Sequence, residues 1–547
     1  MRLRYSLAAF SLVASLSASA YADVITDWNI VAIDTARATG NPNPATRVVA
    51  IAHLAAYDAV NAINKTGEKY LPGTIAVTSP ASVDAAAIQA FHDALVFAVP
   101  SKKADVDKAA EKALAKLEDG PAKTNGIAVG TAAAAALVAA RTGDGSETPG
   151  TYPGEDALGK WRPTPTLLQA ANTPEWATLK TFGLTAPDQF DPGAPPALSS
   201  GAYATAVLET KLYGAKTGSV RTSDETNIAN FWAQQTHLPF FQLARTFSKA
   251  NELSVDENAR FFGQLALALA DARIATWNAK YKYGFWRPVT SINSQLDDGN
   301  PDTAPDAEGD WLPLLETPNH PEYPSGHSAT GAAGATVLAA WFGDKSSFAV
   351  TSETLVGAAY TRSFTSFSDA AQENADSRVY GGIHYRFSND AGLGLGEKVA
   401  DYVLANKLKA FPPPANGEGG AGGEAGAAAG GTGAGGEPEP VAGTSATGGS
   451  GGSTSTETGG TGGAGGTTAG TAGKTNTPQG DAGQPASEGG APSGGGSSSK
   501  AGSSSSGSES DDSGCSISSP AASPTRGVVV ALLALGAVWI RRRQRRN

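Results

Sequence analysis

Sulfur is almost absent from this 547-residue sequence, which contains one cysteine, Cys515, and one methionine, Met1. A single cysteine excludes any disulfide bond within the chain. Thiols and thioethers are also the side chains that peroxide-derived oxidants attack most readily. Residues 23–411, the segment with a globular composition, contain neither group. That segment is therefore suited to contact with strong oxidants.

Two further absences narrow the class of protein. Basic residues are not in excess, because 41 Lys and Arg stand against 52 Asp and Glu, a formal net charge of -11. A nucleic-acid partner, which needs a basic face, is therefore not expected. Alternating Val, Ile and Thr runs typical of strands are nearly absent as well.

Ala-rich amphipathic runs dominate residues 23–411 and predict an all-α fold. The segment is longer than a usual domain of about 100 to 200 residues, so we expect one large domain or two merged helical bundles. Helices are predicted over Arg47–Asn64, Val83–Val99, Lys102–Leu117, Gly126–Arg141, Ala202–Tyr213, Glu225–Phe247, Val255–Tyr281, Gly331–Phe342, Ser352–Ala359 and Asn389–Leu408.

The first 22 residues have the pattern of a signal peptide. Met1–Arg4 is basic, Leu7–Leu16 is apolar, and Ala20-Tyr21-Ala22 supplies a small-x-small cleavage site. The apolar run is too short to span a bilayer. We therefore expect cleavage after Ala22 and export, with an uncleaved anchor as the alternative.

Beyond residue 411 the composition changes twice. Residues 412–514 are rich in Gly, Ser, Ala and Thr, and such a tract cannot bury enough surface to offset its ordering entropy. We expect a disordered linker with a reach of about 50 to 60 Å. Residues 515–547 contain a short apolar segment, 527–540, followed by an arginine cluster, which predicts a short C-terminal membrane helix with a cytoplasmic stop.

This last segment resembles a myxobacterial C-terminal sorting tail. The resemblance implies a sorting protease acting at Cys515, with the protein displayed at the cell surface or outer envelope of a Gram-negative bacterium, or released from it. A plain C-terminal membrane anchor is the alternative, since the apolar run is shorter than the roughly 20 residues of a spanning helix.

The tetrapeptide Pro324-Ser325-Gly326-His327 is followed by an Ala- and Gly-rich apolar run, residues 328–341. This pattern predicts a buried helix with Ser325 at its N-cap. The start of a helix offers unpaired backbone N–H groups and the positive end of a macrodipole. It is a suitable place to bind an anion.

Two other spaced motifs supply charge for such an anion. Lys280 precedes Arg287-Pro288 by a spacing of six residues, and Arg378 precedes His384 by a spacing of five. Guanidinium groups bind tetrahedral oxyanions in a bidentate way, and a lysine acts as a point charge. The set therefore predicts a site for a phosphate-like ion.

The order Lys-x6-Arg-Pro, Pro-Ser-Gly-His, Ser-Arg-x5-His, over residues 280–384, resembles the superfamily of vanadium-dependent haloperoxidases and type 2 phosphatidic acid phosphatases. The resemblance implies helical bundles with the anion site at a bundle end, and vanadate as cofactor. It implies that His384 binds vanadium and that His327 is the general acid/base. Lys280, Arg287 and Arg378 would neutralise the equatorial oxygens, with Ser325 Oγ and the Gly326 N–H completing the site.

The activity implied is oxidation of halide by hydrogen peroxide to hypohalous acid, which then reaches a small organic acceptor. Lys280 would polarise the peroxide. His320, five residues before Ser325, resembles the bromoperoxidase type of the family, whereas a Phe there resembles the chloroperoxidase type. We therefore expect bromide to be favoured. A catalytic segment without sulfur would tolerate hypohalous acid well.

A secreted phosphatase is the main alternative, because phosphate and vanadate are both tetrahedral. His384 would then be the nucleophile that forms a phosphohistidine, and His327 would protonate the leaving oxygen. Phosphatases of this superfamily usually have an Asp four residues after that His. Here the position is Ser388, which favours the peroxidase and leaves open what orients His384. A surface binding module that retains the pocket is a third possibility.

Aromatic residues near the motifs and two long loops are expected to surround the site. Phe285, Trp286 and Tyr323 are expected as pocket walls or core. The two long polar loops, 143–163 and 184–199, are expected to shape the mouth of the site, because long loops in a compact domain are often functional.

Overall fold

The computed structural model describes residues 23–294, 300, 309–352 and 360–412. The chain divides into two units, 1–425 and 426–547, and every described residue belongs to the first. The predicted signal peptide (1–22), nearly all of the linker (412–514) and the sorting tail (515–547) lie outside the described residues, as does most of the expected helix Ser352–Ala359.

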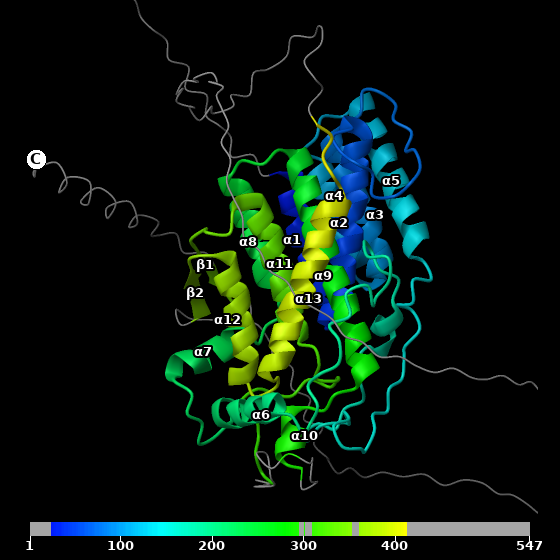
Figure 1. Ribbon diagram of the computed structural model, residues 1–547. Helices are drawn as coiled ribbons and strands as arrows, with labels where there is room; N and C mark the ends of the chain where they lie inside the picture. The colour runs from blue at the N-terminus through cyan, green and yellow to red at the C-terminus, as the bar shows by residue number, and fades with distance from the viewer. Residues whose placement is uncertain (1–22, 295–299, 301–308, 353–359, 413–547) are drawn as a thin grey trace, which may run out of the picture. The chain divides into compact units, whose positions relative to one another are not determined.

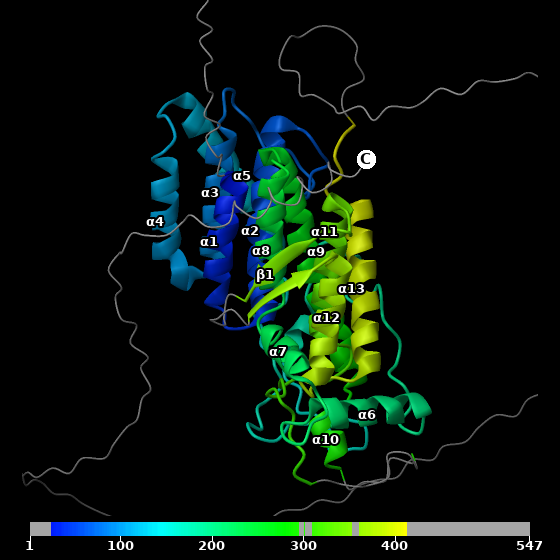
Figure 2. The same ribbon diagram turned by 90° about the vertical axis from the view of Figure 1, so that its left-hand side faces the viewer.

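The helices form two bundles, as Figures 1 and 2 show. Buried residues of both bundles belong to one hydrophobic core. The first bundle consists of α1 (Val24–Arg37), α2 (Pro42–Asn64), α3 (Val83–Ala98), α4 (Lys103–Leu114) and α5 (Pro121–Arg141). The second contains α8 (His237–Ala250), α9 (Val255–Tyr283), α11 (Gly326–Phe342), α12 (Phe367–Tyr380) and α13 (Arg386–Asn406). The bundles meet where α2 packs on α9. The all-α prediction is confirmed.

Shorter elements complete the fold. They are η1 (Pro100–Lys102), η2 (Pro174–Thr178), α6 (Gly201–Gly214), α7 (Ser223–Phe231), α10 (Pro288–Ile292), and the strands β1 (Phe348–Thr351) and β2 (Thr361–Phe364). The strands pair antiparallel with Phe348 opposite Phe364. Within the part of the chain that the structure describes, no helix is both long enough and apolar enough to cross a membrane.

Helix α9 is the longest element and is buried over most of its length. A capping box between Ser254 and Glu257 starts it, satisfying backbone N–H groups that lack helical partners. Gly284 ends it with φ of 58°, a left-handed conformation that glycine adopts without strain. The helix therefore stops directly before the Phe285–Pro288 segment that contains Arg287.

Helices α11 and α13 touch backbone to backbone. A Cβ atom on Gly392 would lie 2.5 Å from the Ser325 carbonyl oxygen, and one on Gly396 would lie 2.1 Å from that of Ala329. Only glycine permits this approach. The contact fixes the start of α11 against α13.

The predicted helix Glu225–Phe247 is wrong, because the chain breaks between α7 and α8 at residues 232–236. Pro239 explains the break. Proline has no N–H to donate and is tolerated in the first turn of a helix, and Pro239 lies in the first turn of α8. Helices α1, α10 and α12 were not predicted.

Buried ion pairs and hydrogen bonds hold the long loop after α5. Asp144 accepts hydrogen bonds from Arg47 and Arg141, each 2.9 Å from Nε to Oδ2. Asp271 of α9 accepts three backbone N–H groups from residues 182–184 at 2.6 to 2.8 Å. These bonds tie the loop to α2 and α5 of the first bundle and to α9 of the second.

Candidate active site

The three sequence motifs meet at one end of the second bundle, the lower end in Figure 1. Lys280 lies in the last turn of α9, Gly326 is the first residue of α11, and Arg378 lies in the last turn of α12. His384 precedes α13. Residues about 100 positions apart in sequence are therefore brought together, as the motif spacing predicted.

The start of α11 has the predicted cap. Ser325 is the N-cap residue, and its Oγ accepts the Ser328 N–H at 3.4 Å and the Ser328 hydroxyl at 2.9 Å. Its own backbone N–H donates to the Ser388 carbonyl at 3.0 Å. The Gly326 N–H lies in the first turn, where an α-helix provides no acceptor.

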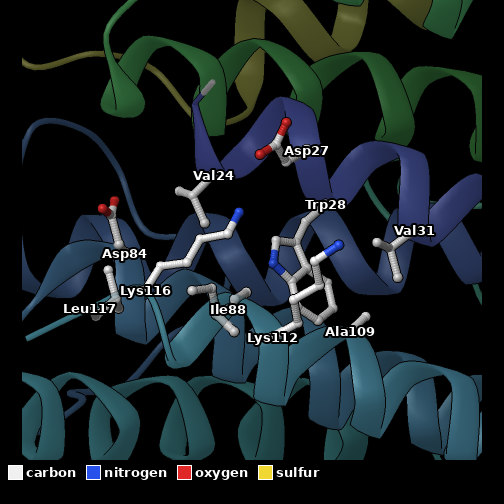
Figure 3. A pocket seen from close by; sticks show the side chains of 11 residues that line it. Val24, Asp27, Trp28, Val31, Asp84, Ile88, Ala109, Lys112, Lys116 and Leu117 are labelled. Atoms are coloured by element: carbon white, nitrogen blue, oxygen red, sulfur yellow. The ribbon is translucent and has the colours of Figure 1, made fainter. Parts of the chain in front are cut away.

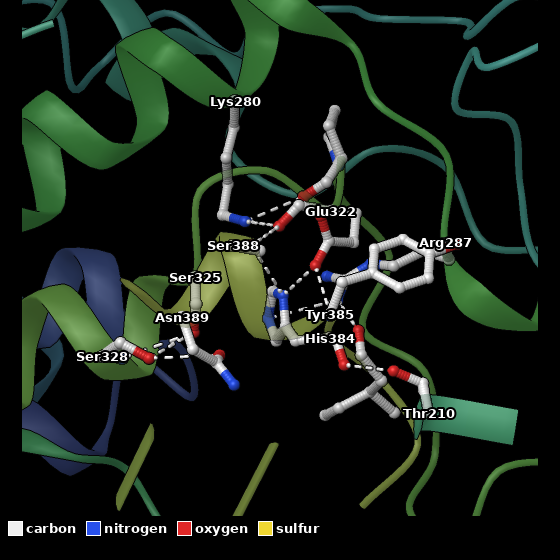
Figure 4. Close-up of polar contacts among 12 residues, drawn as sticks. Thr210, Lys280, Arg287, Glu322, Ser325, Ser328, His384, Tyr385, Ser388 and Asn389 are labelled. Atoms are coloured by element: carbon white, nitrogen blue, oxygen red, sulfur yellow. Dashed lines mark hydrogen bonds and ion pairs between the residues drawn. The ribbon is translucent and has the colours of Figure 1, made fainter. Parts of the chain in front are cut away.

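His384 forms a close pair with a carboxylate that sequence reasoning missed. Its Nδ1 lies 2.7 Å from Oε1 of Glu322, which also accepts the Tyr385 backbone N–H at 3.1 Å (Figure 4). Ser388, at the position expected for an orienting residue, is 3.4 Å from the same nitrogen. Glu322 therefore orients His384, with the Nδ1–H donating and the Nε2 lone pair left for another partner.

Burial and charge shape the electrostatics of this pair. Burial raises the pKa of Glu322 to about 7, and the nearby Lys280 and Arg287 act in the opposite direction. Burial lowers the pKa of His384 well below its usual value, and the surrounding cations lower it further. His384 is thus held with an unprotonated ring nitrogen, the form that can bind a metal centre or attack a phosphoryl group.

Lys280 and Arg287 are fully buried and support this arrangement. Lys280 Nζ donates to the carbonyls of Pro321 and Glu322, each at 2.8 Å. Arg287 Nε donates to the His320 carbonyl at 2.9 Å, and its NH1 lies 3.3 Å from His384 Nε2. Both cations therefore fix the segment that precedes α11 and lie beside the histidine pair.

Arg378, His327 and His320 surround the same space. Arg378 NH1 donates to the Trp232 carbonyl at 3.1 Å, while its buried Nε has no partner among the described residues. His327 Nε2 lies 3.3 Å from the Gln234 carbonyl. His320 Nδ1 lies 3.0 Å from Arg287 NH2, and its ring packs on Trp277 with centroids 4.8 Å apart.

A cavity of about 300 Å³ opens at this place. Of the predicted site residues, five line it: His320, Gly326, His327, Arg378 and His384. Lys280, Arg287 and Ser325 lie behind this lining. The other lining residues are Gly40, Pro42, Asn172, Ala233, Gln234, Gln235, Arg273, Trp277 and Pro318.

The predicted role of the long polar loops is wrong, because neither 143–163 nor 184–199 lines the cavity. Its wall comes from the α1–α2 connection, Asn172 and the α7–α8 break. Phe285, Trp286 and Tyr323 do not line it either. They belong to a separate buried cluster beside α6 and α10, which agrees with their interpretation as core.

A second cavity, of about 330 Å³, lies between α1, α3 and α4 (Figure 3). Trp28 and Ile88 form its apolar wall, with Asp27, Lys112 and Lys116 at its edge. None of the motif residues lines it.

The site has the chemistry of an anion site. Lys280, Arg287, Arg378 and the additional Arg273 bring four basic side chains, whose pKa values burial lowers, to a region where Glu322 is a buried acid. The unpartnered Nε of Arg378 and the free N–H groups of α11 need acceptors. A tetrahedral oxyanion such as vanadate or phosphate meets these requirements.

Comparison with known proteins agrees with this description. Residues 260–411 match the family model of the VCPO second helical-bundle domain. The vanadium chloroperoxidase of Curvularia inaequalis is 35% identical over 109 residues, which is 17% of each chain. The match thus spans about a sixth of that relative.

Solved structures extend the likeness over most of unit 1. A bacterial vanadium-dependent iodoperoxidase superposes with a TM-score of 0.61 and 26% identity, covering 71% of this chain and 97% of the other. A bacterial vanadium-dependent chloroperoxidase in its holo form gives 0.51 and 18%, covering 69% and 91%, and shows the fold alone. The chain has the vanadium haloperoxidase fold, and residues 260–411 resemble the second helical-bundle domain of that family.

Proposed function

We propose that this protein is a vanadate-dependent haloperoxidase, which uses hydrogen peroxide to oxidise halide to hypohalous acid. In balanced form, halide, peroxide and one proton give hypohalous acid and water. The observation that carries the proposal is the Glu322–His384 pair, held beside buried cations at the start of α11, in a segment that matches the VCPO bundle domain.

The residues that would hold vanadate follow from the geometry. His384 Nε2 would bind the vanadium, while Lys280, Arg287 and Arg378 would balance the charge of its oxygens. Ser325 Oγ and the Gly326 N–H would complete the hydrogen bonds. When bound, vanadate would supply Lewis acidity toward peroxide without a change of oxidation state.

The remaining chemistry belongs to the chain's own residues. His327 would accept a proton from incoming peroxide as a general base. Its Nε2 lies against the Gln234 carbonyl, which favours the tautomer with the Nε2–H donating and Nδ1 free to accept. Burial and neighbouring Arg378 and Arg273 lower the pKa of His327, which keeps the ring neutral and able to accept a proton at neutral pH.

We propose bromide as the favoured halide, on the basis of His320 at the cavity wall. The similarity to the bacterial iodoperoxidase makes iodide a necessary second substrate in any assay. A small organic acceptor would take the halogen from hypohalous acid in the last step.

A phosphomonoesterase is the second candidate, and one observation strengthens it. Ser388 argues against a phosphomonoesterase, because no acid follows His384 at the spacing usual in phosphatases of this superfamily. Glu322 supplies that acid from the segment before α11. His384 could thus act as an oriented nucleophile toward a phosphoryl group, with His327 protonating the leaving oxygen.

The two functions are separated by one experiment on the purified full-length chain. One sample is loaded with orthovanadate and the other is kept in phosphate, and each is assayed for peroxide-dependent bromination and iodination of a phenolic dye and for aryl phosphate hydrolysis. We expect vanadate-dependent halogenation that is lost in His384→Ala. Hydrolysis without halogenation would establish the phosphatase instead.

We also propose that the protein is exported, with residues 1–22 removed and the C-terminal tail directing it to the cell surface. This proposal rests on the sequence patterns alone. Fractionation of the producing cells, with an antibody against the helical unit, would detect the protein in the cytoplasm if the proposal is wrong.

A further inference from the structure

Arg273 is a buried arginine of the cavity that none of the three motifs includes. It lies on α9 seven residues before Lys280, about two helical turns away, and its exposed fraction is 3%. Its guanidinium carbon stacks on the Trp277 ring at 4.4 Å from the centroid. Its Nε donates to Asn43 Oδ1 at 2.7 Å. The side chain is thus held in place at two points.

Among the described residues, no acid balances the charge of Arg273. The structure gives it no ion pair with any described residue, and the hydrogen bond to Asn43 is the one it records. Arg47 and Arg141, also buried, both contact Asp144 instead. A buried charge without a partner is costly, so an unpaired guanidinium at a cavity wall indicates that an anion binds there.

The guanidinium lies beside the start of α11, where the oxyanion of the proposed site would bind. Arg273 lines the cavity together with Gly326, His327 and Arg378. Its NH1 would lie 3.3 Å from a Cβ atom placed on Gly326, so it stands beside the first residue of α11. With Nε occupied by Asn43, NH1 and NH2 are the groups left to donate into the cavity. They lie next to the backbone N–H groups that a bound oxyanion would use.

We propose that Arg273 is a fourth cationic side chain of the oxyanion site, donating from NH1 and NH2 to the oxyanion held at the start of α11. This inference rests on the proposed function only in so far as the cavity takes a tetrahedral oxyanion. The ligand class is a multiply charged oxyanion, for which inorganic phosphate and orthovanadate are the probes. Asn43 and Trp277 are positioning residues that hold the guanidinium toward the ligand.

The test is calorimetric titration of the full-length chain with inorganic phosphate and separately with orthovanadate. The variants are Arg273→Gln, Arg273→Lys and Arg378→Gln. Arg260→Gln is the matched control, because Arg260 lies on the same helix and stacks on Trp341 at 4.6 Å, away from the cavity. Thermal unfolding with and without phosphate shows that each variant is folded, and gives a second measure of binding.

We expect Arg273→Gln to weaken binding of both anions by about 10- to 100-fold, the range for loss of a hydrogen bond to a charged group. Arg273→Lys, which retains the charge, should lose less, and Arg260→Gln should bind as the wild type does. If Arg273→Gln unfolds, the affinities of Arg273→Lys and the wild type for the two anions are compared instead, and a weaker affinity in Arg273→Lys supports the inference.

Two results would overturn the inference. One leaves the proposed oxyanion site intact, and the other rules out that site as well. Unchanged affinity in both Arg273 variants, with weakened binding in Arg378→Gln, would mean that Arg273 is structural and the oxyanion site stands. Absence of phosphate and vanadate binding in the wild type would remove the oxyanion site itself, and with it the proposed function.

Discussion

Replacement of Glu322 by Gln tests whether this carboxylate acts on the ligand through His384. The change keeps the size of the side chain and one oxygen that can accept the His384 Nδ1–H. In the wild type, Glu322 Oε1 lies 2.7 Å from that nitrogen. It removes the charge that makes this bond strong. Glu322 Oε2 has no hydrogen-bond partner among the described residues, so replacing this oxygen by an amide nitrogen breaks no hydrogen bond that the structure shows.

The expected effect differs between two anions of the same shape. Loss of a residue that orients a metal-bound histidine typically lowers metal affinity by about 10- to 100-fold, or about 1.4 to 2.7 kcal/mol. Vanadate, which would bond to His384, should lose this amount. Above about pH 7, where Glu322 is ionised, phosphate, held by charge and hydrogen bonds alone, should bind equally or more tightly, because Glu322→Gln removes a negative charge beside Lys280 and Arg287.

The assay is equilibrium titration of the full-length chain with each anion, and Ser388→Ala is the control. The Ser388 hydroxyl lies 3.4 Å from His384 Nδ1, so its loss should change vanadate affinity by less than about threefold. Wild-type vanadate affinity in a folded Glu322→Gln protein would refute the reasoning. An equal loss for vanadate and phosphate would also refute it, because it would indicate general damage to the site.

Three further predictions concern residues around the site. Asp144→Asn should lower the free energy of unfolding by about 3 kcal/mol at neutral pH in urea titration, because it leaves two buried arginines without their acid. Burial raises the pKa of Asp144. The hydrogen bond and charge of Arg47 and the charge of Arg141 lower that pKa by a larger amount, so it lies below its usual value. The stabilisation is therefore complete above about pH 4 and is lost as pH falls through the folded-state pKa, so wild type and variant should converge in acid. Asp271→Asn should cost about 3 kcal/mol in the same measurement, since its three N–H donors would face one amide oxygen. His320→Phe should shift the bromide-to-chloride ratio of kcat/KM toward chloride by about tenfold or more, and an unchanged ratio would exclude His320 as a halide determinant.

Ser325, Gly326 and His327 could be predicted from sequence because they begin a helix whose pattern is local. A capping residue, here Ser325, before an apolar run fixes the helix start within a few positions. Lys280, Arg287, Arg378 and His384 were predicted instead from the spacing of two motifs and its resemblance to a known family. Glu322 could not be predicted in the same way. Its partner is 62 residues further along the chain, and no local rule connects them. The available signal was Glu322 itself, the one acid in His320–His327.

Arg273 and the α7–α8 break were missed for other reasons. Arg273 fits the repeating pattern of α9, where an arginine is usually solvated, and only tertiary packing places it at a cavity. The break was missed because apolar periodicity continues through Glu225–Phe247. Pro239 was the signal against a continuous helix. The Gln234 carbonyl, which lies in the break, is 3.3 Å from His327 Nε2.

The glycine contact between α11 and α13 has a kinetic consequence. Because Gly392 and Gly396 place two backbones in direct contact, α11 cannot slide or rotate without separating the helices. The N–H groups at its start are therefore in position before any ligand arrives. We expect the ligand-free and ligand-bound backbones to superpose closely and association to follow a single phase. The rate of entry would then depend on passage past Gly40, Asn172 and Gln235 at the cavity wall, rather than on a conformational opening of the protein.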